Sequence, residues 1–337
     1  MGRNRIHPLL HKLNRDNLLK ELEENGYVVI QNASDESGDS KLHEYQEWYS
    51  SFKESGESIK RNRYIIDGYR VNHMDSSWST RAKVRQLFGL VWGTQKLLTS
   101  VEGIVLFNPP EKGEGEFRTP DACDLYLEQG VRRQGVHAYR GAVYYENSTE
   151  EDFCFRVLTE SHKHHTDFFN AFPNAAKRSK IDESLKLNKN ERTWFFHNGC
   201  KLKNVPVPKG GLLLWDARMV YDFVPPVCGR SNIDRWTCIV FVSMTPAIWA
   251  DKVDIDLKKE VFDKMLTTNH WSSQGQKVLK VVSSKKRKLD GKFTYDHIAV
   301  KYISSTALWY PCQKLMGMME YTSDEEDYNG PPPPKWQ

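Results

Sequence analysis

KGGLLLWDARMVY, residues 209–221, is the stretch that decides the fold. The glycines make a turn, and the apolar run 211–216 that follows predicts a buried β-strand. Asp216 and Arg218 lie two residues apart, so on an extended chain their side chains face the same way. They are predicted to form an ion pair at the end of this strand.

Other short apolar runs, separated by turn residues, precede and follow this strand. They lie at 27–30, 101–107, 123–128, 136–145, 153–158, 193–197 and 236–244. Several short strands with no long helices between them predict a sandwich or a barrel and argue against a parallel α/β sheet.

Helical patterns flank and interrupt these strands. Three leucines recur at helical spacing within 16–25, and Gly26 ends that pattern before the strand at 27–30. The other segments with a helical pattern lie at 41–54, 79–99, 161–170, 175–188 and 256–268. We expect these helices to cover the faces of the sheets.

The composition is that of one large globular domain. The chain has 337 residues, of which 27% are charged and 12% aromatic, and this length can bury a sizeable core. The net charge of +4 is too small to indicate nucleic acid by itself. No stretch has the apolar length of a membrane span, and the six cysteines lack paired spacing. These features predict an intracellular protein without membrane contact.

A set of landmarks, taken in order, resembles the phytanoyl-CoA dioxygenase-like branch of the Fe(II)/2-oxoglutarate dioxygenases. They lie at 26–30, 135–143, 161–165, 209–218, 234–246 and 267–271. The resemblance implies a mainly β fold with flanking helices and a double-stranded β-helix, or jelly roll, as its core.

The resemblance also implies where a metal would bind, because these enzymes hold iron with two imidazoles and a carboxylate. By position the ligands here are Tyr126, Glu128 and Tyr221. A phenol must lose a proton with an ordinary pKa of about 10 before it ligates a metal, and phenolate favours ferric iron. We therefore expect a degenerate site, with no metal and no cofactor.

Arg235 lies fourteen positions after Tyr221, where the resemblance places the arginine that pairs with 2-oxoglutarate. A structural arginine on a core strand is an equal alternative.

Other residues could build a different metal site. His165 and Asp167 spell His-x-Asp, and His137 and His197 are further imidazoles, with Asp124 or Glu128 as carboxylates. The favoured interpretations are a core histidine at His137 and a surface cluster formed by His162, His164 and His165.

The C-terminal part differs from the jelly-roll domain predicted for 1–275. Residues 276–320 form a basic, partly helical extension that carries the run Lys285, Lys286, Arg287 and Lys288. This run is typical of a nuclear localisation signal or a phosphate-contacting patch, and a solvated loop is the alternative. Residues 321–337 are acidic and then proline-rich, which predicts a disordered tail or, alternatively, a docking peptide for an aromatic groove.

Two functions of different class follow from these observations. The first is a non-catalytic scaffold that associates with itself or with a protein partner, in the nucleus or in both nucleus and cytoplasm. The second is an active oxygenase that binds Fe(II) and 2-oxoglutarate through rearranged ligands. Nucleic-acid binding through Lys285 to Lys288 is a weaker third hypothesis.

Overall fold

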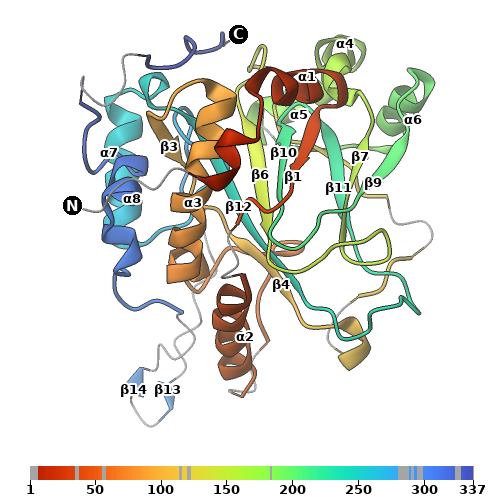
Figure 1. Ribbon diagram of the computed structural model, residues 1–337. Coiled ribbons are helices and arrows are strands. Elements are labelled where there is room, and N and C mark those ends of the chain that lie inside the picture. The colour runs from red at the N-terminus through yellow and green to blue at the C-terminus, as the bar shows by residue number, and fades with distance from the viewer. Residues whose placement is uncertain are drawn as a thin grey trace.

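Two antiparallel β-sheets face each other at the centre of the protein (Figure 1). The computed structural model describes residues 7–34, 38–54, 58–113, 116–119, 123–182, 184–279, 288–289, 292–293, 299–322 and 328–336. The larger sheet has the order β1-β10-β6-β12-β4-β2, with β3 paired to β12. Its strands are β1 (Tyr27–Ile30), β2 (Ile65–Ile66), β3 (Leu97–Thr99), β4 (Ile104–Phe107), β6 (Tyr139–Tyr144), β10 (Leu212–Asp216) and β12 (Thr237–Pro246).

The smaller sheet has the order β8-β5-β11-β7-β9. Its strands are β5 (Tyr126–Leu127), β7 (Cys154–Leu158), β8 (Leu185–Lys186), β9 (Leu202–Val205) and β11 (Val220–Val224). From β4 to β12 the chain passes back and forth between the two sheets, which is the connectivity of a jelly roll. The predicted mainly β jelly roll with flanking helices is confirmed.

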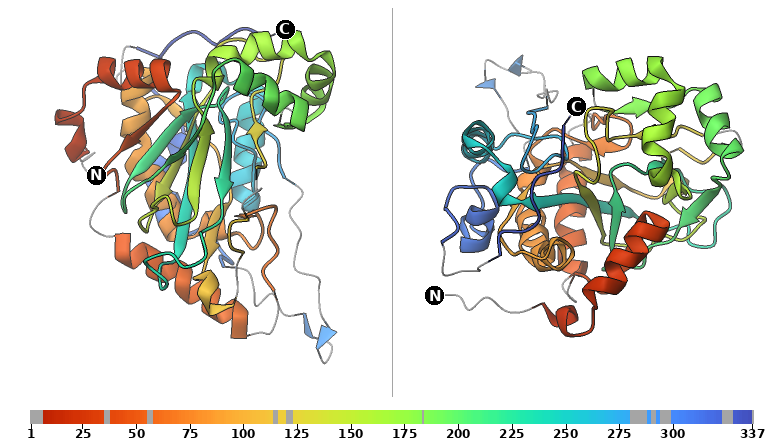
Figure 2. Two further views of the ribbon diagram at one scale, coloured as in Figure 1. Left: turned by 90° about the vertical axis from the view of Figure 1, so that its right-hand side faces the viewer. Right: turned by 90° about the horizontal axis from the view of Figure 1, so that it is seen from above.

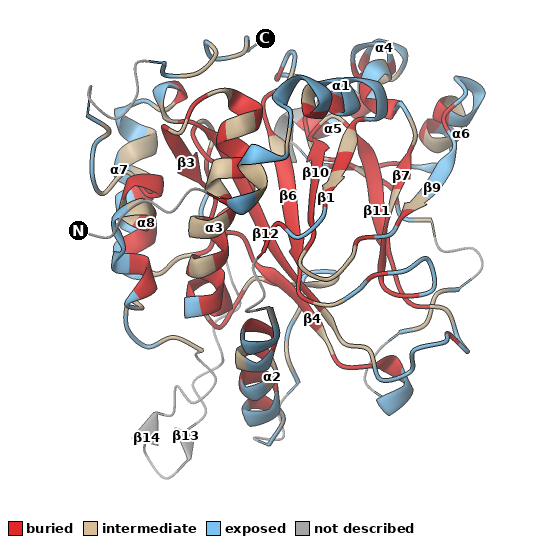
Figure 3. Ribbon diagram, in the orientation of Figure 1, coloured by how far each residue is buried: buried red, intermediate tan, exposed pale blue. Residues whose placement is uncertain are grey.

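The strand predicted from 211–216 is the buried centre of the larger sheet. All five residues of β10 are buried, and they pair with β1 on one side and β6 on the other. Figure 3 shows β10, β6 and β12 in the buried colour, whereas β1 is partly intermediate. The predicted ion pair is confirmed, because Arg218 Nη2 lies 2.6 Å from Asp216 Oδ2.

Helices cover the outer face of the larger sheet. α1 (Arg15–Asn25) begins where the Asn14 side chain accepts from the backbone N–H of Asp16, and it ends at Gly26 with φ 77°. α2 (Gly38–Glu54) and α3 (Asp75–Trp92) pack against the same face through one large apolar cluster.

The segment expected to be one helix at 79–99 is a helix followed by a strand. Gly93 ends α3 in the left-handed conformation, with φ 73°. The next apolar residues, Leu97–Thr99, form β3 against β12. The apolar pattern continues without a break across the end of α3, and Gly93 is the only sequence signal for that end.

A second group of helices covers the smaller sheet: α4 (His165–Ala171), α5 (Pro173–Asp182) and α6 (Lys189–His197). Figure 2 shows this group on the side opposite α3. The strand predicted at 193–197 is wrong, because these residues are the end of α6. A capping box between Asn188 and Glu191 starts the helix, and Phe195 is buried in the apolar cluster beside the sheet.

Two further helices pack beside α3. They are α7 (Lys252–Lys264) and α8 (Tyr310–Leu315), and both share an apolar cluster with Trp78 of α3. Among the described residues, no helix is long and apolar enough to cross a membrane.

The C-terminal segments give two different outcomes. Lys285, Lys286 and Arg287 lie outside the described residues, whereas Lys288 is in the short strand β13 (Lys288–Leu289), which pairs with β14 (Lys292–Phe293). The transport signal stays a prediction. Residues 328–336 differ from the disordered tail that was expected. They lie against the folded domain through hydrogen bonds to Thr94, Trp249 and His137.

Candidate functional site

The two tyrosines at the expected metal positions are neighbours across the smaller sheet. Tyr126 of β5 is the direct partner of Tyr221 of β11. Tyr221 is buried between the sheets, and its ring lies 5.3 Å from Phe155 and 5.5 Å from Trp215, centre to centre. Tyr126 is only partly buried, and the Arg63 guanidinium lies 3.3 Å from the centre of its ring. Aromatic rings therefore fill this part of the barrel.

A buried guanidinium joins the third expected position to the rest of the interior. Arg140 of β6 forms ion pairs with both Glu128 and Glu102, and its Nη1 donates to the Tyr221 hydroxyl at 3.2 Å. Its guanidinium also lies 5.1 Å from the Trp215 ring. The ion cluster Glu102, Arg140 and Glu128 thus occupies the centre of the jelly roll, beside Tyr221.

The members of the ion cluster stabilise one another's charged forms. Burial opposes ionisation of Glu128, but Arg140, His270 and the Tyr221 hydroxyl bring its pKa below the ordinary value. Burial likewise opposes the charge on Arg140, and the two glutamates more than reverse that effect and raise its pKa. Burial and then the charge of Glu128 raise the pKa of Tyr221 well above 10. Tyr221 is therefore a neutral phenol at physiological pH.

These residues do not fit an Fe(II) centre. Tyr221 is far from ionisation, and the Glu128 carboxylate is already bonded to a guanidinium. Across the described residues, no group of three or more histidine, cysteine, aspartate or glutamate side chains is arranged to hold a metal. Arg140 instead supplies a positive charge to the carboxylate at the third position.

His270 is a further buried polar group beside the ion cluster. It is 9% exposed, and burial together with Arg140 and Arg133 lowers its pKa to about 3 against the opposing charge of Glu128. Its Nε2 has no hydrogen-bond partner within the described part of the chain. A neutral imidazole with a free nitrogen therefore lies near Glu128.

Arg235 lies just before the first residue of β12. Ser243, which contacts the ion cluster, lies toward the other end of the same strand. Its Nη1 is 2.6 Å from Asp152 Oδ2, and Arg230 holds the other Asp152 oxygen at 2.9 Å while also pairing with Glu111. The structure thus places Arg235 in a rim cluster made of Glu111, Asp152, Arg230 and Arg235.

The alternative metal ligands are held separately, each by its own contacts. His137 Nε2 lies 3.0 Å from the Lys335 carbonyl, and His165 Nε2 lies 2.8 Å from the Gln129 carbonyl. Burial is the largest cause that lowers the pKa of each to about 4. His197 and Asp167 are exposed, on α6 and α4. His137 is a bonded core histidine, as expected. The expected surface cluster is wrong for His162 and His165, because both are buried and bonded to backbone carbonyls.

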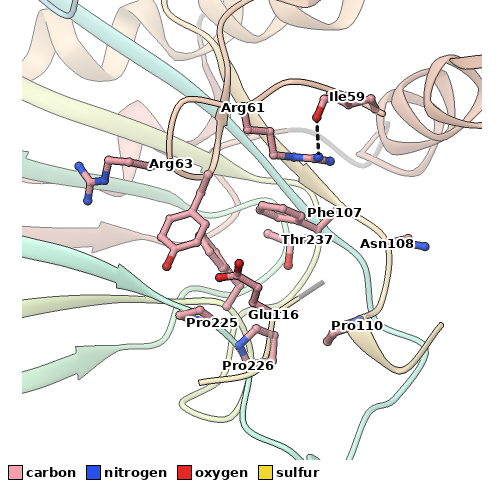
Figure 4. A pocket seen from close by; sticks show the side chains of 12 residues that line it. Ile59, Arg61, Arg63, Phe107, Asn108, Pro110, Glu116, Pro225, Pro226 and Thr237 are labelled. Atoms are coloured by element: carbon pink, nitrogen blue, oxygen red, sulfur yellow. Dashed lines mark hydrogen bonds between the residues drawn. The ribbon is translucent and has the colours of Figure 1, made fainter. Parts of the chain in front are cut away.

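A cavity of about 360 Å³ opens at the rim of the barrel, where β4 and β11 end and β7 and β12 begin. Aromatic rings, prolines and two arginines form most of its wall, and Figure 4 shows Arg61 and Arg63 across the cavity from Pro225 and Pro226. The volume is within the range of small-molecule sites, about 300–1,000 Å³. The residues that line it are Ile59, Arg61, Arg63, Tyr64, Phe107, Asn108, Pro110, Glu116, Phe153, Pro225, Pro226 and Thr237.

Three residues of the interior did not stand out in the sequence: Glu102, Arg140 and His270. Arg140 carried the clearest signal, since a charged residue interrupts the apolar run 136–145. Its partners were not visible, because they are 38 and 12 residues away in the chain.

Comparisons with known proteins find distant similarity. No protein-family model matches the chain. The chain is 23% identical over 268 residues to Ava biosynthesis cluster protein O from Aspergillus versicolor, covering 74% of this chain and 84% of that protein.

Two solved structures with similarity are bacterial proteins. AviO1 from Streptomyces viridochromogenes Tue57 is 13% identical, with 70% of this chain and 96% of AviO1 covered and a TM-score of 0.43. EctD from S. alaskensis, in a structure with 2-oxoglutarate and 5-hydroxyectoine, is 10% identical, with 74% and 84% covered and a TM-score of 0.43.

Proposed function

We propose that this protein is a non-catalytic member of the Fe(II)/2-oxoglutarate dioxygenase superfamily that acts by binding. The observation that carries the proposal is the Arg140 guanidinium, which is bonded to Glu128 and to the Tyr221 hydroxyl at the positions where the family would hold iron. A guanidinium neutralises the carboxylate with its positive charge, as a metal ion would, and adds hydrogen bonds. Unlike a metal ion, it offers no open coordination position.

The ion cluster then has a structural role. Glu102 is tied further by the Ser100 hydroxyl at 2.7 Å and the Ser243 hydroxyl at 2.9 Å. Buried charges of this kind are stable only when each is paired and hydrogen-bonded. The cluster therefore links β12 to the chain segment before β4, and it fixes the interior in one arrangement.

Binding is assigned to surfaces away from the ion cluster. The rim cavity suits a small molecule with a flat apolar body, because Tyr64, Phe107 and Phe153 pack edge to face or tilted beside it. The scaffold function also includes a protein partner or a second copy of the chain.

Anaerobic calorimetry of metal-stripped protein with Fe(II), and then with 2-oxoglutarate, tests the proposal. The native protein should show no binding beyond that of an unrelated protein. The double variant Tyr126→His, Tyr221→His should remain weak because Arg140 still holds Glu128, and the triple variant that adds Arg140→Met should gain binding. Micromolar binding by the native protein, worth about 8 kcal/mol, would overturn the proposal.

An active oxygenase with rearranged ligands is the second candidate function. It is favoured by the free Nε2 of His270 near Glu128, and a biosynthetic role fits the name of the Aspergillus versicolor relative. Under this hypothesis the native protein turns over 2-oxoglutarate, and His270→Ala abolishes both turnover and iron binding. Turnover that survives His270→Ala would exclude these ligands.

A further inference from the structure

The chain's own C-terminal segment lies on the surface of the folded domain beside the larger sheet. The residues that contact it form what we call the tail site: Thr94, Lys96, Arg133, Gln134, His137 and Trp249. Residues 328–336 cross the top of the molecule in Figure 1, and the right view of Figure 2 shows them from above. Thr94 Oγ1 donates to the Tyr328 carbonyl at 2.9 Å, and Lys96 Nζ donates to Asn329 Oδ1 at 2.9 Å. Both contacts come from the link between α3 and β3, so the segment begins beside that strand.

The middle of the segment is recognised through a proline carbonyl. Trp249 Nε1 donates to the carbonyl of Pro331 at 2.8 Å. The Trp249 ring packs at 5.0 Å and nearly perpendicular to Trp92, which holds the indole in place. Proline-rich segments are pre-ordered and carry unpaired carbonyls, and aromatic grooves that offer a donor recognise them in this way.

The end of the segment is anchored by an aromatic clamp. The Arg133 guanidinium lies between two indoles, 3.5 Å from the Trp271 ring and 4.0 Å from the Trp336 ring. Trp336 keeps 42% of its surface exposed, so partial burial and this stacking together hold it in place. Gly275 makes room for the clamp, since a Cβ there would come within 2.4 Å of Arg133.

Backbone contacts fix the register of the segment between these two anchors. The Gln134 N–H donates to the Lys335 carbonyl at 3.0 Å, and His137 Nε2 lies 3.0 Å from the same oxygen. Arg133 also lies near enough to His270 for its charge to lower the pKa of that histidine. The tail site therefore borders the ion cluster, although it forms a separate binding surface.

We propose that the tail site recognises a proline-rich peptide with a tryptophan five residues after the bound proline carbonyl. Residues 328–336 fill it in cis, and the partner it fits is the same segment of a second copy of this chain. Tyr321, whose hydroxyl donates to the Leu97 carbonyl at 2.7 Å, tethers the chain just before the segment. The short tether gives the cis segment an effective concentration of about millimolar, so exchange between copies requires that the cis segment be weakened.

The partner named here rests on the proposed function, but the test does not involve the ion cluster. A fluorescent peptide with the sequence of residues 328–337 is titrated into the full chain and into Trp336→Ala, with anisotropy as the readout. Trp336→Ala should bind the peptide about tenfold more tightly than the native chain, because its own segment competes less well. A peptide whose tryptophan is replaced by alanine should not compete.

Two matched variants locate the binding site. Trp249→Phe in the Trp336→Ala background keeps an aromatic ring but removes the donor to the proline carbonyl, and Arg133→Lys keeps the charge but not the flat stacking surface. Each should weaken peptide binding, while circular dichroism confirms the fold. Equal binding by native and Trp336→Ala chains, or binding that neither variant changes, would overturn the inference and leave the metal titration unaffected.

Discussion

Two ion clusters with the same kinds of charge lie toward opposite ends of β12, and they differ in how many cations hold their carboxylates. In the ion cluster at the centre of the barrel the Arg140 side chain is 4% exposed, and Glu102 and Glu128 are 8% and 12% exposed. In the rim cluster Arg230 and Asp152 are 1% and 5% exposed, Arg235 and Glu111 are 15% and 20% exposed, and two guanidiniums hold Asp152. The sequence resemblance pointed to Arg235, yet the arginine bonded to Glu128 and Tyr221, the positions that the resemblance gives to metal ligands, is Arg140.

Under the proposed function, Arg140 pairs the carboxylate that an active relative would use to hold a metal. A metal site lost by substitution of its imidazoles leaves a buried carboxylate, and such a charge must be paired or neutralised. Arg140 supplies the pairing from the neighbouring sheet. In the rim cluster Asp152 is paired with two guanidiniums, Arg230 and Arg235, so the loss of one leaves its charge paired.

Arg140→Leu should give the largest effect and so tests the comparison most severely. It leaves Glu102 and Glu128 buried without their cation, which should lower the free energy of unfolding by about 3–5 kcal/mol. Urea unfolding measures the loss. The matched control is Glu102→Gln, Glu128→Gln, Arg140→Met, which removes every charge and should cost much less. If the single and triple variants are equally destabilised, lost packing and not unpaired charge is the cause.

His270 offers a second test, through pH. Its pKa is about 3 in the folded protein, below the ordinary value of about 6.5. As the pH falls from about 6.5 toward 3, the unfolded chain binds a proton that the folded chain does not, so stability falls across that window, by up to about 1.4 kcal/mol per pH unit. His270→Gln should flatten the dependence of unfolding free energy on pH.

A control at another buried ring supports the assignment to burial. Burial also lowers the pKa of His73 to about 3, and His73→Gln should flatten the same curve by a similar amount. An unchanged slope for His270→Gln would mean that the imidazole takes up its proton in the folded state.

Local signals predicted much of the fold, and tertiary contacts decided the rest. Gly26 and the apolar run 211–216 gave the end of α1 and the buried strand β10, because both depend on nearby residues. The run 193–197 was misassigned because the Asn188 capping box outweighed the aromatic content. A docking peptide was the alternative prediction for the tail. The residues that the tail contacts, such as Trp249, are far away from it in the chain, so the sequence could not identify them.

The candidate site was only partly predictable for the same reason. The resemblance placed Tyr126 and Tyr221 together, and the structure has them as direct strand partners. It could not show that Arg140 would reach Glu128, since that contact depends on how the two sheets face each other. Charged residues inside apolar runs, as Arg140 is, are the signal to use in related sequences.

Tyr221→Phe should have a smaller effect than either change above. The hydroxyl accepts from Arg140 Nη1 at 3.2 Å, and a hydrogen bond to a charged group contributes about 1.5–3 kcal/mol. Because Arg140 keeps its ion pairs with both glutamates, the loss of unfolding free energy should lie near the lower of these two values. Thermal unfolding measures it, with Tyr126→Phe as the control at the partly buried partner. A larger loss for Tyr126→Phe would mean that the Tyr126 hydroxyl contributes more to stability than the Tyr221 hydroxyl.

Arg235→Gln should have the smallest effect and completes the comparison. Asp152 keeps its bond to Arg230 at 2.9 Å and accepts from the Thr149 backbone and hydroxyl, so its charge stays paired. A partly exposed ion pair with a second cation present should contribute about 1 kcal/mol or less. The matched control is Arg230→Gln, at a side chain only 1% exposed that bonds both Glu111 and Asp152, and this change should cost more. If Arg235→Gln destabilises as much as Arg140→Leu, the second cation on Asp152 is not what separates the two clusters, and Arg235 has a role that its contacts do not show.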